Sequence, residues 1–120
     1  MSGSARSLFI FGIYSILLGT TLMVDPNFLL GVFGIAHTTE PWIRVAGMLL
    51  FALGIYYVLG GHRGLTDFIR WSVYTRSSVV FFFITFVLLH LAPPVLILLG
   101  CVDLAAAIWT GVALKSEGKL

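Results

Sequence analysis

The stretch SLFIFGIYSILLGTTLMV, Ser7–Val24, decides the class of fold. Its 18 residues carry no charge, and Asp25-Pro26-Asn27 follow it directly. A secretory signal peptide has a shorter apolar core, about 7–15 residues, which ends at a small-residue cleavage site. A helix needs about 20 residues to cross a hydrocarbon core about 30 Å thick. We therefore expect Ser7–Val24 to be a retained transmembrane helix.

The whole chain has the same apolar character. Of its 120 residues 59% are hydrophobic and only 10% are charged, and the mean hydropathy is +1.06. Soluble domains are about 45–50% apolar and about 25% charged. The net charge of +2 is spread over the ends of apolar runs, which leaves no basic face for nucleic acid. The composition predicts a protein solvated by membrane lipids, with no nucleic-acid partner.

Three further runs are long enough to span a membrane: Trp42–Gly61, residues 67–91 and Pro94–Leu114. Only helices satisfy their own backbone hydrogen bonds in lipid, apart from closed barrels. We therefore predict an all-α integral membrane four-helix bundle, built as one domain over residues 1–120. The short segment His90–Pro94 makes the last two helices an antiparallel hairpin.

The loops contain candidate helix caps. Asp25 is suited to cap a short helix that has Pro26 at its first position, so we expect a short interfacial helix between the first two spans. Pro94 suits the first turn of the last helix. Thr66 or Asp67 is suited to cap the third span.

The positive charges predict an orientation. With four spans, the two termini and the second loop share one side. That side holds six of the seven cationic side chains: Arg6, Arg63, Arg70, Arg76, Lys115 and Lys119. The other side holds only Arg44. Because cytoplasmic loops carry the excess of Lys and Arg, we expect both termini to be cytoplasmic.

Glycines recur at a helical spacing in the first two spans. Gly12 and Gly19 are seven residues apart, as are Gly47 and Gly54, so each pair lies on one helix face and allows close backbone approach. The segments Phe9–Gly19 and Phe51–Gly61 also resemble each other. This similarity is open to two interpretations, an internal duplication or the narrow composition of membrane helices.

Asp103 lies near the middle of the last span. On a helix it shares a face with Gly100, Ala107 and Thr110, which is small and polar and predicts that the carboxylate points into the bundle. Counting at about 1.5 Å per residue places Asp103 level with Tyr14 and Ser15, whose hydroxyls can donate to it.

Arg44 and Arg76 lie about 9 and about 10 Å away along the membrane normal by the same count, one on each side. Three interpretations of Asp103 remain open: a structural hydrogen bond or ion pair, a ligand contact, and a proton-coupling site.

Other chemistry is not indicated. His37 and His90 lie in separate loops without supporting ligands, so we expect no metal site and no cofactor. Cys101 is the only cysteine and is expected to be an inert buried thiol. No nucleophile motif, phosphate loop or catalytic carboxylate pair is present. We predict no catalytic residues, and the sequence favours a role that is not enzymatic.

The segments LMVDPNFLLGVFGI and TEPWIRVAGMLLFALGIYY resemble the DoxX-like superfamily of small four-helix membrane proteins. The resemblance covers about Phe9–Val58 and is carried by Glu40, Arg44 and Gly47. It implies a four-helix bundle in the bacterial inner membrane. It implies no particular biochemical role, because most such relatives have none that is settled.

The leading functional hypothesis is an intramembrane pocket for a small apolar molecule or lipid. We expect six residues to form this pocket or a polar core: Asp103, Tyr14, Ser15, Arg44, Arg76 and Trp109. One alternative is an accessory subunit of a larger membrane complex, which the glycine- and alanine-rich helix faces suit. Another is a small proton-coupled transporter that acts as a homodimer, a likeness of architecture alone.

Overall fold

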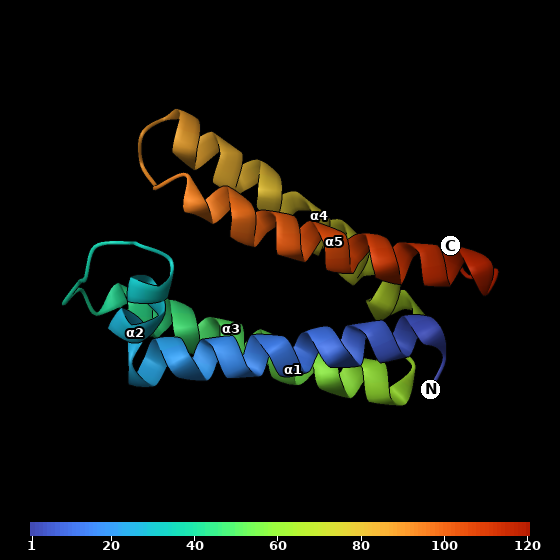
Figure 1. The fold of residues 1–120 in the computed structure, drawn as a ribbon. Coiled ribbons are helices and arrows are strands. Elements are labelled where there is room, and N and C mark those ends of the chain that lie inside the picture. The colour runs from blue at the N-terminus through green and yellow to red at the C-terminus, as the bar shows by residue number, and fades with distance from the viewer. The chain divides into compact units, whose positions relative to one another are not determined.

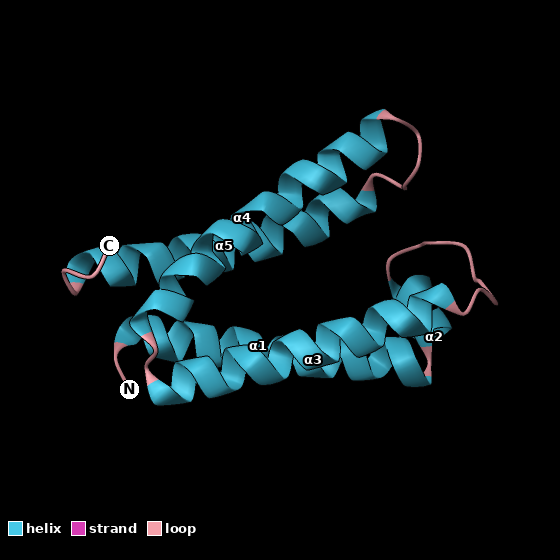
Figure 2. Ribbon diagram, turned by 180° about the vertical axis from the view of Figure 1, so that it is seen from behind, coloured by secondary structure: helices cyan, strands magenta, loops and turns pink.

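A computed structural model describes all of residues 1–120 and shows five helices and no strand (Figures 1 and 2). The helices are α1 Gly3–Val24, α2 Pro26–Val32, α3 Trp42–Arg63, α4 Thr66–Leu88 and α5 Val95–Ser116. All but α2 have 22 or 23 residues and are long and apolar enough to cross a membrane. The predicted all-α class, the four spans and the short helix after the first span are confirmed. The protein is a small multi-pass membrane protein.

The helix boundaries differ from the predicted ones by a few residues. The helix α1 begins at Gly3 rather than at residue 7, and α5 ends at Ser116 rather than at residue 114. The apolar runs stop at the first charged residue, whereas backbone hydrogen bonding continues past it. At the start of α1 the Ser2 hydroxyl accepts a hydrogen bond from the Ala5 amide at 3.2 Å, so the helix is capped before Arg6 is reached.

Four helices end in the same type of turn. The residues Gly34, Gly64, His90 and Gly118 have φ of 70°, 63°, 59° and 70°. At His90, its own amide donates to the Val87 carbonyl at 3.0 Å, and the Leu91 amide donates to the Phe86 carbonyl at 2.8 Å. This is the Schellman pattern, which usually has glycine at the left-handed position. Because histidine takes that position here, α4 stops at Leu88 and not at residue 91 as predicted.

The predicted caps were right for α2 and wrong for α4. The Asp25 carboxylate accepts from the Phe28 amide at 3.3 Å, and Pro26 opens the helix. At α4, Leu65 holds the capping position and makes no side-chain cap. The helix starts one residue earlier than a Thr66 cap requires, so Thr66 and Asp67 lie in its first turn. At α5, Pro94 holds the position just before the first helical residue.

The contacts divide the chain into two units, Phe9–Leu59 and a second unit made of Met1–Leu8 with Gly60–Leu120. The prediction that residues 1–120 form a single domain therefore stays a prediction. In the Phe9–Leu59 unit, α1 and α3 pack through their glycines. A Cβ built on Gly12 would lie 2.9 Å from the Gly54 carbonyl oxygen, and one built on Gly19 would lie 2.6 Å from that of Gly47. The predicted close backbone approach is confirmed. The two glycines that the internal similarity aligns, Gly12 and Gly54, face each other.

The second unit is built on the antiparallel α4–α5 hairpin, which both views show side by side (Figures 1 and 2). Gly100 allows the two helices to approach, because a Cβ there would lie 2.9 Å from the Cα of Val80. The first residues of α1 join this hairpin through Ser4 and Ser7. The candidate site lies where these three segments meet.

Candidate functional site

Arg76 is a buried cation inside the α4 span, with 1% of its surface exposed. Its guanidinium points back along the helix to the preceding turn. Nε donates to the Ser72 carbonyl at 3.2 Å and Nη2 to the Ser72 hydroxyl at 3.2 Å. Nη2 also donates to Thr110 Oγ1 on α5 at 2.9 Å. Neutral oxygen acceptors on two helices therefore hold the arginine in place.

Thr110 connects this arginine to α1. Its hydroxyl is 2.6 Å from the Ser7 hydroxyl and 3.1 Å from the Ala106 carbonyl, and Ser7 is 2.8 Å from the Ser4 carbonyl. Each hydroxyl has a single proton to donate. Either Thr110 donates to Ser7 and Ser7 to Ser4, or Ser7 donates to Thr110 and Thr110 to Ala106. We call Ser7, Ser72, Arg76 and Thr110 the Arg76 network.

A second set of bonds ties the C-terminal tail to the same end of the unit. The Glu117 carboxylate accepts from the Ser4 amide at 3.0 Å and from the Ser4 hydroxyl at 2.7 Å. These bonds hold the pKa of Glu117 below its usual value, and a carboxylate is also favourable at the N-terminus of a helix. Arg70 donates through Nε and Nη2 to the Lys119 carbonyl, at 3.2 and 2.6 Å. The tail therefore fixes the first turns of α1 and α4.

Asp103 is half-buried on the face of α5 that was expected to point inward. Its face neighbours Gly100, Ala107 and Thr110 are buried, whereas Val102 and Ile108 are exposed. Because Asp103 precedes Thr110 by seven residues, or about 10 Å of helix, it lies beyond the Arg76 network. Two of the predicted site residues, Asp103 and Arg76, thus both lie on the α4–α5 hairpin.

Trp109, Ser15 and Tyr14 have different surroundings in their own units. Trp109 lies on α5 with 47% of its surface exposed, on the side away from the buried face. Ser15 is fully buried and donates to the Phe11 carbonyl at 3.0 Å. The Tyr14 ring lies 5.6 Å from the ring of Phe11, centroid to centroid.

Arg44 is an exposed residue of the first turn of α3. It donates to the carbonyl of Met23 and to that of Val24, the latter at 3.3 Å. It therefore caps the C-terminal end of α1. Tyr14, Ser15 and Arg44 all belong to the Phe9–Leu59 unit, so their contact with Asp103 stays a prediction.

Three members of the network were not predicted from the sequence: Ser72 and Thr110, which accept from Arg76, and Ser7, which bonds Thr110. One signal was present, because Ser72 and Arg76 are four residues apart and so lie on one helix face. Thr110 was expected on the inward face of its helix, but nothing linked it to Ser7, which is 103 residues away, and serines and threonines are common in membrane helices.

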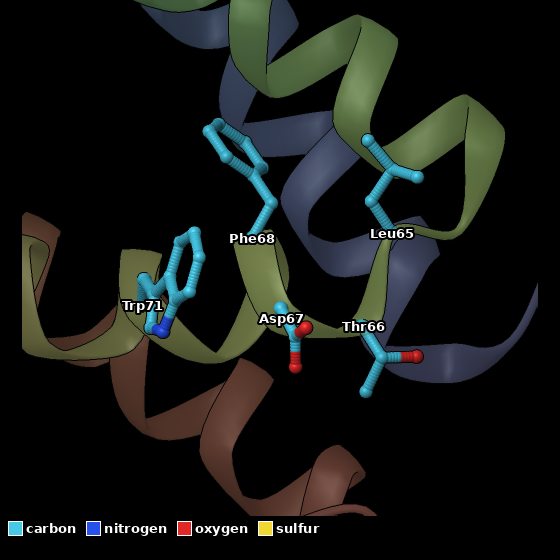
Figure 3. Close-up of a pocket in the computed structure, with 5 residues that line it drawn as sticks. All are labelled: Leu65, Thr66, Asp67, Phe68 and Trp71. Atoms are coloured by element: carbon cyan, nitrogen blue, oxygen red, sulfur yellow. The ribbon is translucent and has the colours of Figure 1, made fainter.

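A separate hollow lies at the start of α4. It is lined by Leu65, Thr66, Asp67, Phe68 and Trp71. Leu65 and Phe68 point to one side of the helix, and Thr66 and Asp67 point to the other (Figure 3). The Phe68 ring packs against Gly60 near the end of α3, where a Cβ would collide with it.

The Arg76 network provides a fixed cation, and Asp103 provides a carboxylate that can accept a hydrogen bond. No three His, Cys, Asp or Glu side chains are placed together to hold a metal ion. Comparisons with protein-family models, curated proteins and solved structures find no match.

Proposed function

We propose that this protein binds a small apolar molecule or lipid through a polar contact at Asp103. One observation carries the proposal: a carboxylate inside the α5 span is only half-buried, on a helix face whose members Gly100, Ala107 and Thr110 are buried. Ionisable residues within spans are costly and usually mark a ligand or ion site.

The two charged residues have different roles in this proposal. The donors of Arg76 that bond Ser72 and Thr110 hold its charge in a fixed position, as pre-organised binding sites require. Asp103 lies next to the exposed side chain of Val102. A ligand that lies along α5 thus meets an apolar surface with one hydrogen-bond acceptor. The fitting molecule has an apolar body and one donor group.

We also propose the location. Five of the seven cationic side chains, all but Arg44 and Arg76, lie at the end that holds both termini, which supports cytoplasmic termini. The resemblance to the DoxX-like superfamily over residues 9–58 supports the bacterial inner membrane.

The ligand is tested by mass spectrometry of small molecules retained by the protein after purification in mild detergent. The wild type is compared with Asp103→Asn and with Glu40→Gln, a control that changes an exposed loop carboxylate. We expect one defined molecule in the wild type and in Glu40→Gln, and its loss from Asp103→Asn without a loss of melting temperature. If all three proteins retain the same molecules, Asp103 is not a ligand contact. A stable partner chain or proton-linked flux in vesicles would instead favour an accessory subunit or a transporter.

The orientation is tested by labelling with a membrane-impermeant maleimide in a Cys101→Ser background. We expect Thr39→Cys in the loop after α2 to react in intact spheroplasts. Ser116→Cys at the end of α5 is expected to react only after permeabilisation. The reverse pattern would place both termini outside.

A further inference from the structure

Cationic side chains collect at one end of the unit formed by Met1–Leu8 and Gly60–Leu120. The bonds of Glu117 to Ser4 and of Arg70 to Lys119 bring the segments of this end together. It carries five cations, Arg6, Arg63, Arg70, Lys115 and Lys119, against two side-chain carboxylates, Asp67 and Glu117.

Both carboxylates are already paired. Asp67 lies 3.0 Å from Arg70, and Glu117 lies 3.4 Å from Lys119. The other three cations, Arg6, Arg63 and Lys115, are exposed and form no ion pair. This end therefore presents a positive charge that the protein does not neutralise itself.

Exposed apolar side chains lie at the start of α4, at the same end of this unit. Leu65 is 54% exposed and Trp71 is 61% exposed, and both line the hollow at the start of α4 (Figure 3). Trp71 is five residues past the first residue of α4, or about 8 Å along the helix. This is the depth at which tryptophan is enriched, between headgroups and acyl chains.

We propose that this end binds an anionic phospholipid. The lipid phosphate pairs with the exposed cations of this end, Arg63 first because it is two residues from Leu65, and the start of an acyl chain lies in the hollow against Leu65 and Trp71. The charge selects the anionic headgroup, because cations near a membrane surface attract anionic lipids. The exposed aromatic and aliphatic side chains match the apolar part of the same molecule. The proposal does not depend on a ligand at Asp103.

The test uses quenching of tryptophan fluorescence by brominated lipids in reconstituted vesicles. A protein with Trp42→Phe and Trp109→Phe keeps Trp71 alone. Its quenching by brominated phosphatidylglycerol is compared with its quenching by brominated phosphatidylcholine. The matched control has Trp71→Phe and Trp109→Phe and keeps Trp42, the first residue of α3 and therefore at the end of that helix opposite Arg63.

We expect Trp71 to prefer phosphatidylglycerol by about fivefold or more, the effect of about one cation near an anionic surface. The ratio of quenching by the two lipids should fall towards one in the double variant Arg63→Gln/Lys115→Gln. It should also fall in high salt without any substitution, because salt screens exposed charges. Trp42 should show no preference, because the exposed carboxylates of Asp25 and Glu40 offset the charge of Arg44 at that end. Equal quenching of Trp71 by both lipids, or a preference that survives both the substitutions and the salt, would overturn the proposal.

Discussion

The hydroxyl of Thr110 should make a measurable contribution to stability, because it joins three helices. Valine has nearly the same shape as threonine but lacks the hydroxyl. Thr110→Val therefore removes the acceptor for Arg76 Nη2 at 2.9 Å and the bond to Ser7 at 2.6 Å. Thr110 is completely buried, so no solvent can replace these bonds.

The expected loss follows from the two bonds. A hydrogen bond to a charged group contributes about 1.5–3 kcal/mol, and a neutral bond between membrane helices contributes about 0.6 kcal/mol. We expect Thr110→Val to lower the free energy of unfolding by about 2–3.5 kcal/mol. In a double-mutant cycle of Ser7→Ala and Thr110→Val, the coupling energy should be close to that of the neutral bond, about 0.6 kcal/mol.

The matched control is Thr85→Val on α4. Thr85 is exposed, and its hydroxyl bonds only to the Phe81 carbonyl of its own helix at 2.9 Å, so its loss should stay within about 0.5 kcal/mol. The assay is reversible unfolding in mixed micelles with increasing dodecyl sulfate, followed by circular dichroism. If Thr110→Val costs no more than Thr85→Val, the Arg76 network does not stabilise the protein and the argument from its bonds is wrong.

Two other substitutions test the packing of α1 and the tail. Gly19→Ala should destabilise the protein by about 1–3 kcal/mol, because its Cβ would lie 2.6 Å from the Gly47 carbonyl oxygen. The control Gly111→Ala, whose Cβ would meet nothing nearer than 3.7 Å, should be neutral or slightly stabilising in the same unfolding assay. Equal effects of the two substitutions would contradict the close approach of α1 and α3. Glu117→Gln should destabilise at neutral pH, because the bonds from Ser4 lower the pKa of Glu117 in the folded protein. Its contribution is fully present above the unfolded pKa of about 4.3 and disappears as the pH falls through the folded value, so unfolding curves of variant and wild type should converge in acid.

The sequence predicted what depends on local chemistry. The uncharged run Ser7–Val24 was enough to predict the first span, and Asp25 with Pro26 was enough to predict α2. The seven-residue spacing of glycines predicted the close approach of α1 to another helix. The early stop of α4 was missed, because a left-handed residue is expected to be glycine and His90 gives no such signal.

The candidate site was predicted less well, because it depends on which helices meet. Asp103 drew attention as a charge at mid-membrane depth, yet the extensive hydrogen bonding belongs to Arg76. Its partners on α5 and α1 are single hydroxyls, and no sequence pattern distinguishes a hydroxyl that binds an arginine from one that bonds to its own helix. Only the pairing of the helices brings them together.

The shared turn at the helix ends has a consequence for the choice of membrane. The four spans have 22, 22, 23 and 22 residues, or about 33–35 Å of helix each, so their charged end residues reach past a hydrocarbon core of about 30 Å. Because the spans have almost the same length, a bilayer with shorter acyl chains would impose a similar hydrophobic mismatch on each of them. We therefore expect this protein to prefer bilayers of one thickness. That thickness depends on where the turns at Gly64, His90 and Gly118 end three of its spans.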